Sequence, residues 1–547
     1  MRPVVSADEM RAAEDAVFAA EPGVDLMSRA AAAVVEITEV MAEGPVLVLV
    51  GSGNNGGDGL FAAARLAASR PVSLWLVGSA VHAEGVAAAR AAGCRELDAA
   101  GAVAALDETS LVIDALVGIG GRPGLRPEAA VLAEACEALG VPVLAVELPS
   151  GLDADSGHAH PSFRAARTVT FAAPKRCHVL EPARSRCGRV IVAEIGVPVP
   201  ETGLRQIDEA DVARWWPVPD WSSDKYSRGV VGLHAGSRLY PGAAILSCAG
   251  ALGAGAGMVR YLGASGKGLI LGRFPSVVTA PGRVQAHVVG SGWGESNPEL
   301  LRRLKNSGLP VVADADALAS LPLGDGSGGP AESPVGGVGV LAGPPVGTGA
   351  SVARVVSPEV AARSVSSVGD ACPVDPDAAA RAGCLVGTDA DPLTTTQASG
   401  VSARPGAADD LLHGWLLTPH AGELARLLGV ERAAVVADPV GHARAAAAAT
   451  GATVLLKGAT QCVAEPNGRV TFAVAGPAWT AQAGSGDVLA GAAGSLLAAG
   501  LEPWKAGVLA ASLQAMTARR HPGPLTPDAL AAHFPSVIGD ITTTHAL

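Results

Sequence analysis

Short apolar runs recur along the first part of the chain, and each is followed by a polar or glycine-containing turn and an Ala-rich stretch. The runs occupy residues 45–50, 72–77, 111–113 and 141–146. An apolar run without alternation is typical of a strand that is buried on both faces of a sheet. Residues 1–40 instead show helical spacing, around 12–20 and 26–35. Strands that alternate with helices predict a parallel sheet covered on both faces.

The pattern pauses at residues 215–221, where the sequence WWPVPDW is typical of a linker or domain edge. A second series follows, with strands predicted at 230–233, 286–289, 311–313, 416–418 and 453–456 and helices predicted at 243–256 and 485–497. Because 547 residues exceed one ordinary core, we expect more than one domain. The predicted domains are 1–204 and 205–547.

One stretch, at about residues 320–408, has no sustained period and is rich in Gly, Pro, Ser, Ala and Val. Such a composition favours a flexible surface insertion in the second domain. A functional lid and a gene-model or frame error are the other two interpretations. The sequence alone does not separate the three.

Charge and cysteine content narrow the class of protein. The formal net charge is -12 and no basic stripe is present, so nucleic acid and anionic membranes are not expected as partners. The eight cysteines are scattered without a C-x-x-C pair, which indicates a reducing compartment and neither a disulfide framework nor a zinc site. The first residues lack a signal layout, and no apolar run approaches the roughly 20 residues of a membrane helix. We therefore expect a cytoplasmic protein.

Several ligand-binding motifs follow predicted strands of the first domain. Residues 51–59, GSGNNGGDG, come after a strand and precede a helix, where close N–H groups suit a phosphate or ribose. The segments 114–124 and 147–151 follow other predicted strands, and we expect both of them, together with 168–175, at the binding edge of a parallel sheet. Asp114 and Glu147 each place a carboxylate there. Either could transfer protons, and a turn cap is the alternative for Asp114.

The motifs GxGNNGGDG, DALxGxG, xxPSG and TxTFxxPK resemble those of the NAD(P)H-hydrate epimerase domain, over about residues 1–200. The resemblance implies a Rossmann-like three-layer domain that interconverts the R and S hydrates NADHX and NADPHX. It implies substrate binding by Asn54, Asn55, Gly56, Gly57, Asp58, Gly118, Ile119, Gly120, Gly121, Arg122, Pro123, Gly124 and Glu147. It also implies a K⁺ ion bound by Asn55, Asp114 and Ser150. Glu147 stands where the family usually has Asp.

In the second domain, the sequence AGSGD at 483–487 is the strongest single motif. A Gly-Ser-Gly turn at a helix N-terminus forms an anion hole for a transferring phosphate, and Asp487 lies beside it as a base. A glycine-rich helix start with an Asp cap is the structural alternative. Lys457, followed by glycine, suits a nucleotide phosphate or ribose. His420 lies near Glu423 in TPHAGE and is a candidate ligand.

AGSGD, KG and DADAL resemble the ribokinase-like α/β fold, and TPHxGE, KYSRG and YPGAA resemble the ADP/ATP-dependent NAD(P)H-hydrate dehydratases. This likeness covers about residues 205–318 and 415–540. It implies contacts to the S-hydrate from Ala243, Gly294, His420 and Asp487. It implies binding of the adenine nucleotide by Lys457, Gly458, Ala459, Thr460, Gln461 and Gly486. ADP is expected first and ATP second, with Mg²⁺ as cofactor.

Two other functions remain open. A ribokinase-like small-molecule kinase with an accessory nucleotide-binding domain would keep Asp487 and the anion hole. A non-catalytic nucleotide-binding regulator would bind ligand without turnover. The expected partners of the repair enzyme are the hydrates and an adenine nucleotide. A homo-oligomer is left open.

Overall fold

The structure is a computed structural model, and it describes residues 1–78, 80–321 and 411–544. Of the stretch 320–408, only residues 320 and 321 are among the described residues. The three interpretations of this stretch therefore remain predictions. Within the described residues, no helix combines the length and apolar character needed to cross a bilayer.

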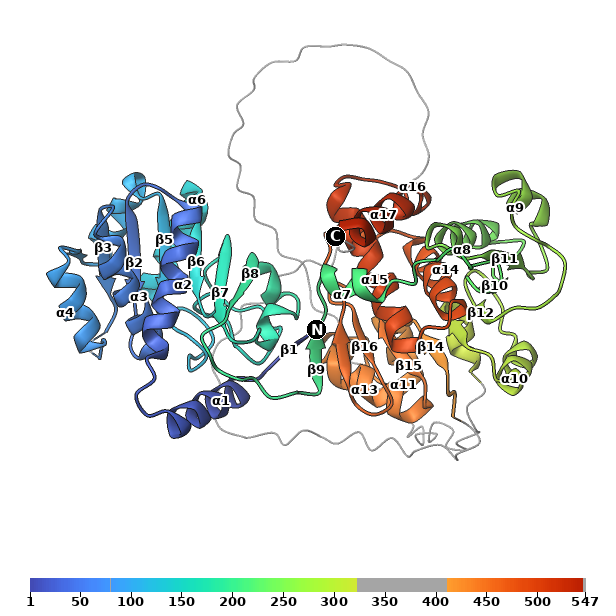
Figure 1. Cartoon of the computed structure of the whole chain (residues 1–547), viewed down its shortest axis with the longest axis horizontal. Coiled ribbons are helices and arrows are strands. Elements are labelled where there is room, and N and C mark those ends of the chain that lie inside the picture. Colours follow the sequence, from blue (N-terminus) through green and yellow to red (C-terminus); the bar gives the residue numbers. More distant parts are fainter. Residues whose placement is uncertain (79, 322–410, 545–547) are drawn as a thin grey trace, which may run out of the picture. The chain divides into compact units, whose positions relative to one another are not determined.

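The first sheet is parallel throughout, with the order β4-β3-β2-β5-β6-β7-β8 (Figure 1). Its strands are β2 (Val46–Val50), β3 (Val72–Leu76), β4 (Arg95–Leu97), β5 (Leu111–Ala115), β6 (Val143–Val146), β7 (Arg167–Phe171) and β8 (Arg189–Ala193). The helices are α1 (Ala7–Ala20), α2 (Leu26–Met41), α3 (Asn54–Leu66), α4 (Ala83–Ala91), α5 (Ala99–Ala104) and α6 (Pro127–Leu139). The four predicted strands and both early helices are confirmed.

Both faces of this sheet are buried at its centre, where a strand such as β2 is apolar at every position. In β2, Val46, Val48 and Val50 pack in a core shared with α1 to α4. Leu47 and Leu49 point into a separate core shared with α5 and α6. The absence of alternation in the sequence therefore reflects a three-layer arrangement.

The second sheet is mixed, with the order β1-β9-β17-β16-β15-β14-β13-β12-β10-β11. Its strands are β1 (Arg2–Pro3), β9 (Leu204–Gln206), β10 (Val230–His234), β11 (Met258–Tyr261), β12 (Ala286–Val289), β13 (Val311–Ala313), β14 (Trp415–Leu417), β15 (Thr453–Leu456), β16 (Cys462–Ala464) and β17 (Val470–Phe472). The six strands from β15 to β11 are parallel, and β16 is antiparallel to both of its neighbours. The chain start adds β1 antiparallel to β9. The predicted boundary at 204/205 lies within β9.

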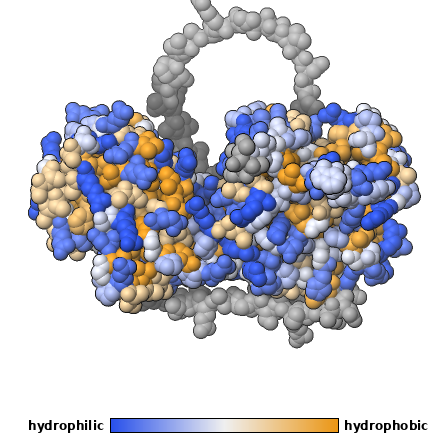
Figure 2. Space-filling model, in the orientation of Figure 1, coloured by the Kyte–Doolittle hydropathy of each residue, from blue (hydrophilic) through white to orange (hydrophobic). Residues whose placement is uncertain are grey.

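Helices cover this sheet on two faces as well. They are α7 (Glu209–Trp215), α8 (Pro241–Gly253), α9 (Lys267–Arg273), α10 (Pro298–Ser307), α11 (Ala421–Leu428), α12 (Arg432–Ala437), α13 (Pro439–Thr450), α14 (Ser485–Ala498), α15 (Pro503–Arg520), α16 (Pro527–Ala532) and α17 (Phe534–Thr544). Val312 packs in a core with α8, α14 and α15, whereas Val311 and Ala313 pack in the core with α11 and α13. Other hydrophobic residues remain at the surface among hydrophilic ones (Figure 2).

The predicted helices of the second series are confirmed with small shifts. Helix α14 begins at the predicted Ser485, after Gly484 at φ +89°. Helix α8 begins two residues earlier than predicted, because Pro241 occupies its first turn, and it ends at Gly253. These two helix starts place the motifs of the second domain at the carboxyl edge of the parallel strands.

Candidate active sites

A cavity of about 1080 Å³ lies at the carboxyl edge of the first sheet. Most of the residues expected to bind the hydrate line it, namely Asn54, Asn55, Asp58, Gly118, Ile119, Gly120, Gly121, Arg122, Pro123, Gly124 and Glu147. Ser150, which was expected to bind K⁺, lines it as well. Gly56 and Gly57 lie behind the wall, in the first turns of α3. A Cβ at Gly56 would lie 2.0 Å from the carbonyl oxygen of Gly51. That glycine is therefore needed for close packing between helix and turn.

The two candidate carboxylates occupy different places. Glu147 lines the cavity, whereas Asp114 is fully buried at the end of β5 and does not line it. Asp114 Oδ1 accepts a hydrogen bond from the Ser150 hydroxyl at 2.6 Å, and its Oδ2 accepts one from the Ser150 backbone N–H at 2.8 Å. Burial raises the pKa of Asp114 to about 6, against the effect of these hydrogen bonds. The geometry favours Glu147 for proton transfer and Asp114 for holding Ser150.

Glu147 has a buried cationic partner that is absent from the predicted set. Lys175, which follows β7, is fully buried and forms an ion pair with the Glu147 carboxylate. Its ammonium also donates hydrogen bonds of 3.0–3.1 Å to Thr170 Oγ1 and to the carbonyl oxygens of Phe171 and Ala173. The Glu147 backbone is left-handed, with φ +71°. The motif TxTFxxPK contained Lys175, but nothing in the sequence paired it with Glu147.

Helix α1 also contributes to this cavity, which the sequence did not indicate. Arg11 and Glu14 line it beside Asp58. Burial raises the pKa of Asp58 well above its usual range, and the negative charges of Glu147 and Glu14 add to the effect. Asp58 is therefore protonated more readily than an exposed carboxylate.

The oxygen atoms around Ser150 fit a potassium ion. Ser150 Oγ lies 3.5 Å from the Val117 carbonyl oxygen, and a Cβ at the adjacent Gly118 would lie 3.2 Å from Asn55 Oδ1. The Asn55 Nδ2 atom is buried without a hydrogen-bond partner. A carboxylate, a hydroxyl and an amide oxygen are the donors that hard cations prefer.

A second cavity, of about 940 Å³, lies at the carboxyl edge of the second sheet. The predicted residues that line it are His420, Lys457, Gly458, Ala459, Thr460, Gln461, Gly486 and Asp487. Ala243 and Gly294 do not line this cavity. They lie instead by the turn at 290–294, where a Cβ at Gly292 would be 2.5 Å from the Ala243 Cβ atom and the Gly294 N–H donates to Asp316.

Asp487 lies in the first turn of α14, beside the Gly484–Gly486 backbone. Burial raises its pKa to about 6, with the charge of Asp314 adding to the effect, while Ser291 and Lys457 oppose it. The Lys457 ammonium forms an ion pair with Asp314 at 2.5 Å. Burial opposes the charged form of Lys457, but Asp314 and Glu423 raise its pKa above the usual value.

His420 serves both as a helix cap and as part of the cavity wall. Its Nδ1 accepts hydrogen bonds from the backbone N–H groups of Gly422 and Glu423 at the start of α11. This arrangement places the proton of the neutral ring on Nε2, which lies 3.4 Å from a Glu423 oxygen. His420 therefore caps α11 and at the same time lines the cavity in which it was predicted to bind substrate.

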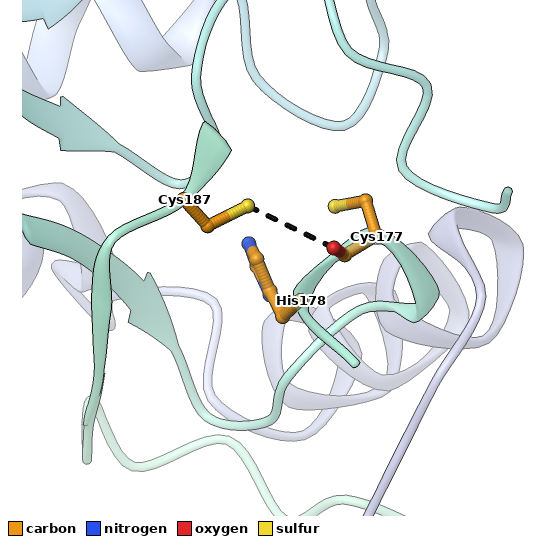
Figure 3. Close-up of side chains that lie close together, drawn as sticks. All are labelled: Cys177, His178 and Cys187. Atoms are coloured by element: carbon orange, nitrogen blue, oxygen red, sulfur yellow. Dashed lines mark hydrogen bonds between the residues drawn. The ribbon is translucent and has the colours of Figure 1, made fainter. Parts of the chain in front are cut away.

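Cys177, His178 and Cys187 come together in the first domain, with their donor atoms within 4.8 Å of one another (Figure 3). All three are buried. The Lys175 backbone N–H donates to His178 Nδ1 at 2.9 Å, so the neutral ring carries its proton on Nε2. A metal ion would need the lone pair of that nitrogen, because Nδ1 is already occupied. The geometry therefore favours a protonated Nε2 of His178 beside the two thiol groups, and it does not favour a metal site.

Two α/β sheets, each with a carboxylate-bearing cavity at its carboxyl edge, define an enzyme with two separate active sites. Two family models match the chain. The model for the YjeF-related protein N-terminus matches residues 23–177, and the model for NAD(P)H-hydrate dehydratase matches residues 231–324 and 378–533.

Whole-length relatives carry both parts. A bifunctional NAD(P)H-hydrate repair enzyme of Mycobacterium tuberculosis is 36% identical over 521 residues, which cover 92% of this chain and 90% of the relative. One from Corynebacterium glutamicum is 30% identical and covers 91% and 87%. The chain thus belongs to the family of bifunctional NAD(P)H-hydrate repair enzymes.

Among solved structures, an ADP/ATP-dependent NAD(P)H-hydrate dehydratase from Bacillus subtilis, co-crystallised with ATP and Mg²⁺, matches 62% of this chain and 98% of its own. Its identity is 19% and its TM-score 0.42.

Proposed function

We propose that residues 1–204 interconvert the R and S forms of hydrated NADH and NADPH, and that residues 205–547 dehydrate the S form at the expense of ADP or ATP. Family membership over nine-tenths of the chain supports this assignment. The observation that carries it is the pair of cavities, in which Glu147 and Asp487 each place a carboxylate among the motif residues.

In the first cavity, the hydrate carries a hydroxyl on the carbon next to the ring nitrogen. Protonated Asp58 donates to this hydroxyl as it leaves with the electron push of the nitrogen, and water returns to the other face. Glu147 takes the proton of that water, while buried Lys175 balances its charge. Asn55, Asp114 and Ser150 would hold K⁺, which would supply a fixed positive charge close to the substrate.

In the second cavity, Asp487 takes the proton of the hydrate hydroxyl as the oxygen attacks the terminal phosphate of the nucleotide. The bond to the bridging oxygen breaks, and AMP leaves from ADP, or ADP from ATP. Backbone N–H groups at 484–486 stabilise the developing negative charge. Inorganic phosphate then leaves from the ester as its C–O bond to the ring breaks with help from the ring nitrogen. Loss of a proton from the neighbouring carbon to water restores the dihydronicotinamide. Lys457 to Gln461 would hold the nucleotide. Carboxylates that line the cavity, such as that of Asp487, are ligands that would suit Mg²⁺, which when bound would neutralise charge on the nucleotide phosphates.

The test uses separated R and S hydrates with purified protein, with and without ADP or ATP and Mg²⁺. We expect dihydronicotinamide absorbance to return from the S hydrate only with nucleotide, and R to S conversion without it. Asp487→Asn should abolish the first reaction and Glu147→Gln the second. A stable phosphorylated product would instead indicate a kinase, and binding without turnover a regulator. Localisation in the cytoplasm and oligomeric state stay predictions.

A further inference from the structure

Asp314 connects the ends of four adjacent strands, although no motif assigned it a function. It follows β13 and is 2% exposed. Its Oδ1 accepts hydrogen bonds from Lys457 Nζ after β15, at 2.5 Å, and from the Thr418 hydroxyl after β14, at 2.8 Å. Its Oδ2 accepts one from the Ser291 hydroxyl after β12, at 3.3 Å. The strands β15, β14, β13 and β12 are consecutive neighbours in the sheet.

The same groups surround the proposed base. The Ser291 hydroxyl is also within reach of Asp487, so it donates its single hydrogen either to Asp314 or to Asp487. The charges of Lys457 and Asp314 both act on Asp487. Glu423 lies 3.9 Å from the Lys457 ammonium, and His420 lies next to Glu423. One ammonium thus stands among three carboxylates, and its shortest contact is to Asp314. Because this cluster is largely buried, the ion pair holds the lysine side chain in one place.

We propose that Asp314 is a positioning residue of the dehydratase site, which fixes the Lys457 ammonium and the Ser291 hydroxyl beside Asp487. With both groups fixed, the substrate hydroxyl lies beside Asp487 and in line with the terminal phosphate that it attacks. This inference rests on the proposed dehydratase function. Asp314 itself is assigned no proton transfer, because its carboxylate already forms an ion pair with the Lys457 ammonium and accepts a hydrogen bond from Thr418.

A purely structural function would give a different result on mutation. If Asp314 only joined the strand ends, Asp314→Asn would weaken nucleotide binding and turnover together. As a positioning residue, it should affect kcat and not affinity. Removing its negative charge also leaves fewer charges that repel the phosphates, so ADP should bind equally well or more tightly.

The experiment compares wild type with Asp314→Asn, Lys457→Met and the double variant. We expect Asp314→Asn to lower kcat for the S hydrate by about 100-fold, as for a displacement of roughly 1 Å. The KM for ADP should not rise. The acidic limb of the kcat profile should move to lower pH, because Asp314 no longer raises the pKa of Asp487. In the Lys457→Met background, Asp314→Asn should cost less than tenfold.

Controls are available within the chain. Thermal unfolding of each variant reports whether the second domain has folded, and epimerase activity reports on the first. Glu502→Gln removes an exposed carboxylate that, among the described residues, pairs with nearby Lys505 and Trp504. A kcat within twofold of wild type, an unmoved acidic limb or fully additive losses would overturn the proposal. If wild type shows no dehydration, the proposed function fails, and ADP titration calorimetry still decides the role of Asp314. Tenfold weaker ADP binding by Asp314→Asn would then overturn it, and unchanged or tighter binding would support it.

Discussion

Replacing Lys175 by methionine should destabilise the first domain strongly. The ammonium is fully buried, forms an ion pair with Glu147 and donates three hydrogen bonds of 3.0–3.1 Å. Removing one partner of a buried pair costs about 3–5 kcal/mol, because the other charge is left in a medium of low polarity. Native domains are stable by only about 5–15 kcal/mol. A large part of the folding free energy is therefore at stake.

The double variant Lys175→Met/Glu147→Gln separates the pair from the individual residues. It leaves no buried charge, so we expect a coupling free energy of about 2 kcal/mol between the two sites. Urea unfolding, followed by hydrogen exchange of peptides from residues 143–171, measures the free energy of unfolding locally. Lys505→Met is the matched control, since its exposed pair with Glu502 should contribute less than about 1 kcal/mol. Additivity of the two single changes within about 0.5 kcal/mol would refute the reasoning.

Three further predictions concern activity. With its pKa raised to about 6 by burial, Asp487 is protonated at lower pH, so kcat of dehydration should fall tenfold per pH unit below about pH 6; a flat profile down to pH 5 would contradict this. Gly56→Ala should abolish epimerisation while dehydration continues, because its Cβ meets the Gly51 carbonyl oxygen at 2.0 Å; normal R to S conversion would exclude that packing. Exchanging K⁺ for a large organic cation should slow epimerisation at least tenfold, because that cation is too large to bind the oxygen atoms of Asn55, Asp114 and Ser150. An equal rate of epimerisation in both salts would show that the site does not need K⁺.

Strands were predicted well from the sequence where burial on both faces determined which residues occur in them. Runs such as Val46–Val50 are apolar at every position, and only a strand between two helical layers places all of them in a core. Strands near the sheet edges were harder to predict. Residues 95–97 are exposed or half-buried and mixed in polarity, so no apolar run marks them. Residues 189–193 are also exposed or half-buried, and only four of them, 190–193, form an apolar run.

The site residues were predictable as far as a motif lies on one loop. The binding loops at 118–124 and 457–461 line the cavities as expected. Contacts between loops were not predictable, because Lys175 reaches Glu147 across 28 positions and Lys457 reaches Asp314 across 143. Which carboxylate a buried lysine meets depends on strand order, and strand order is not encoded in local spacing. The pairing of β1 with β9 was missed for the same reason.

The left-handed backbone at Glu147 restricts what evolution or a designer can place there. A non-glycine residue at φ +71° carries a conformational cost on the order of 1–3 kcal/mol, and Asp and Asn bear this conformation better than Glu. Selection for folding alone would therefore enrich Gly, Asn and Asp at this position and eliminate Val and Ile. Selection for epimerisation would retain only the acids. A library with all amino acids at position 147, tested under each selection, would thus separate the need for an acid from the need for a left-handed backbone.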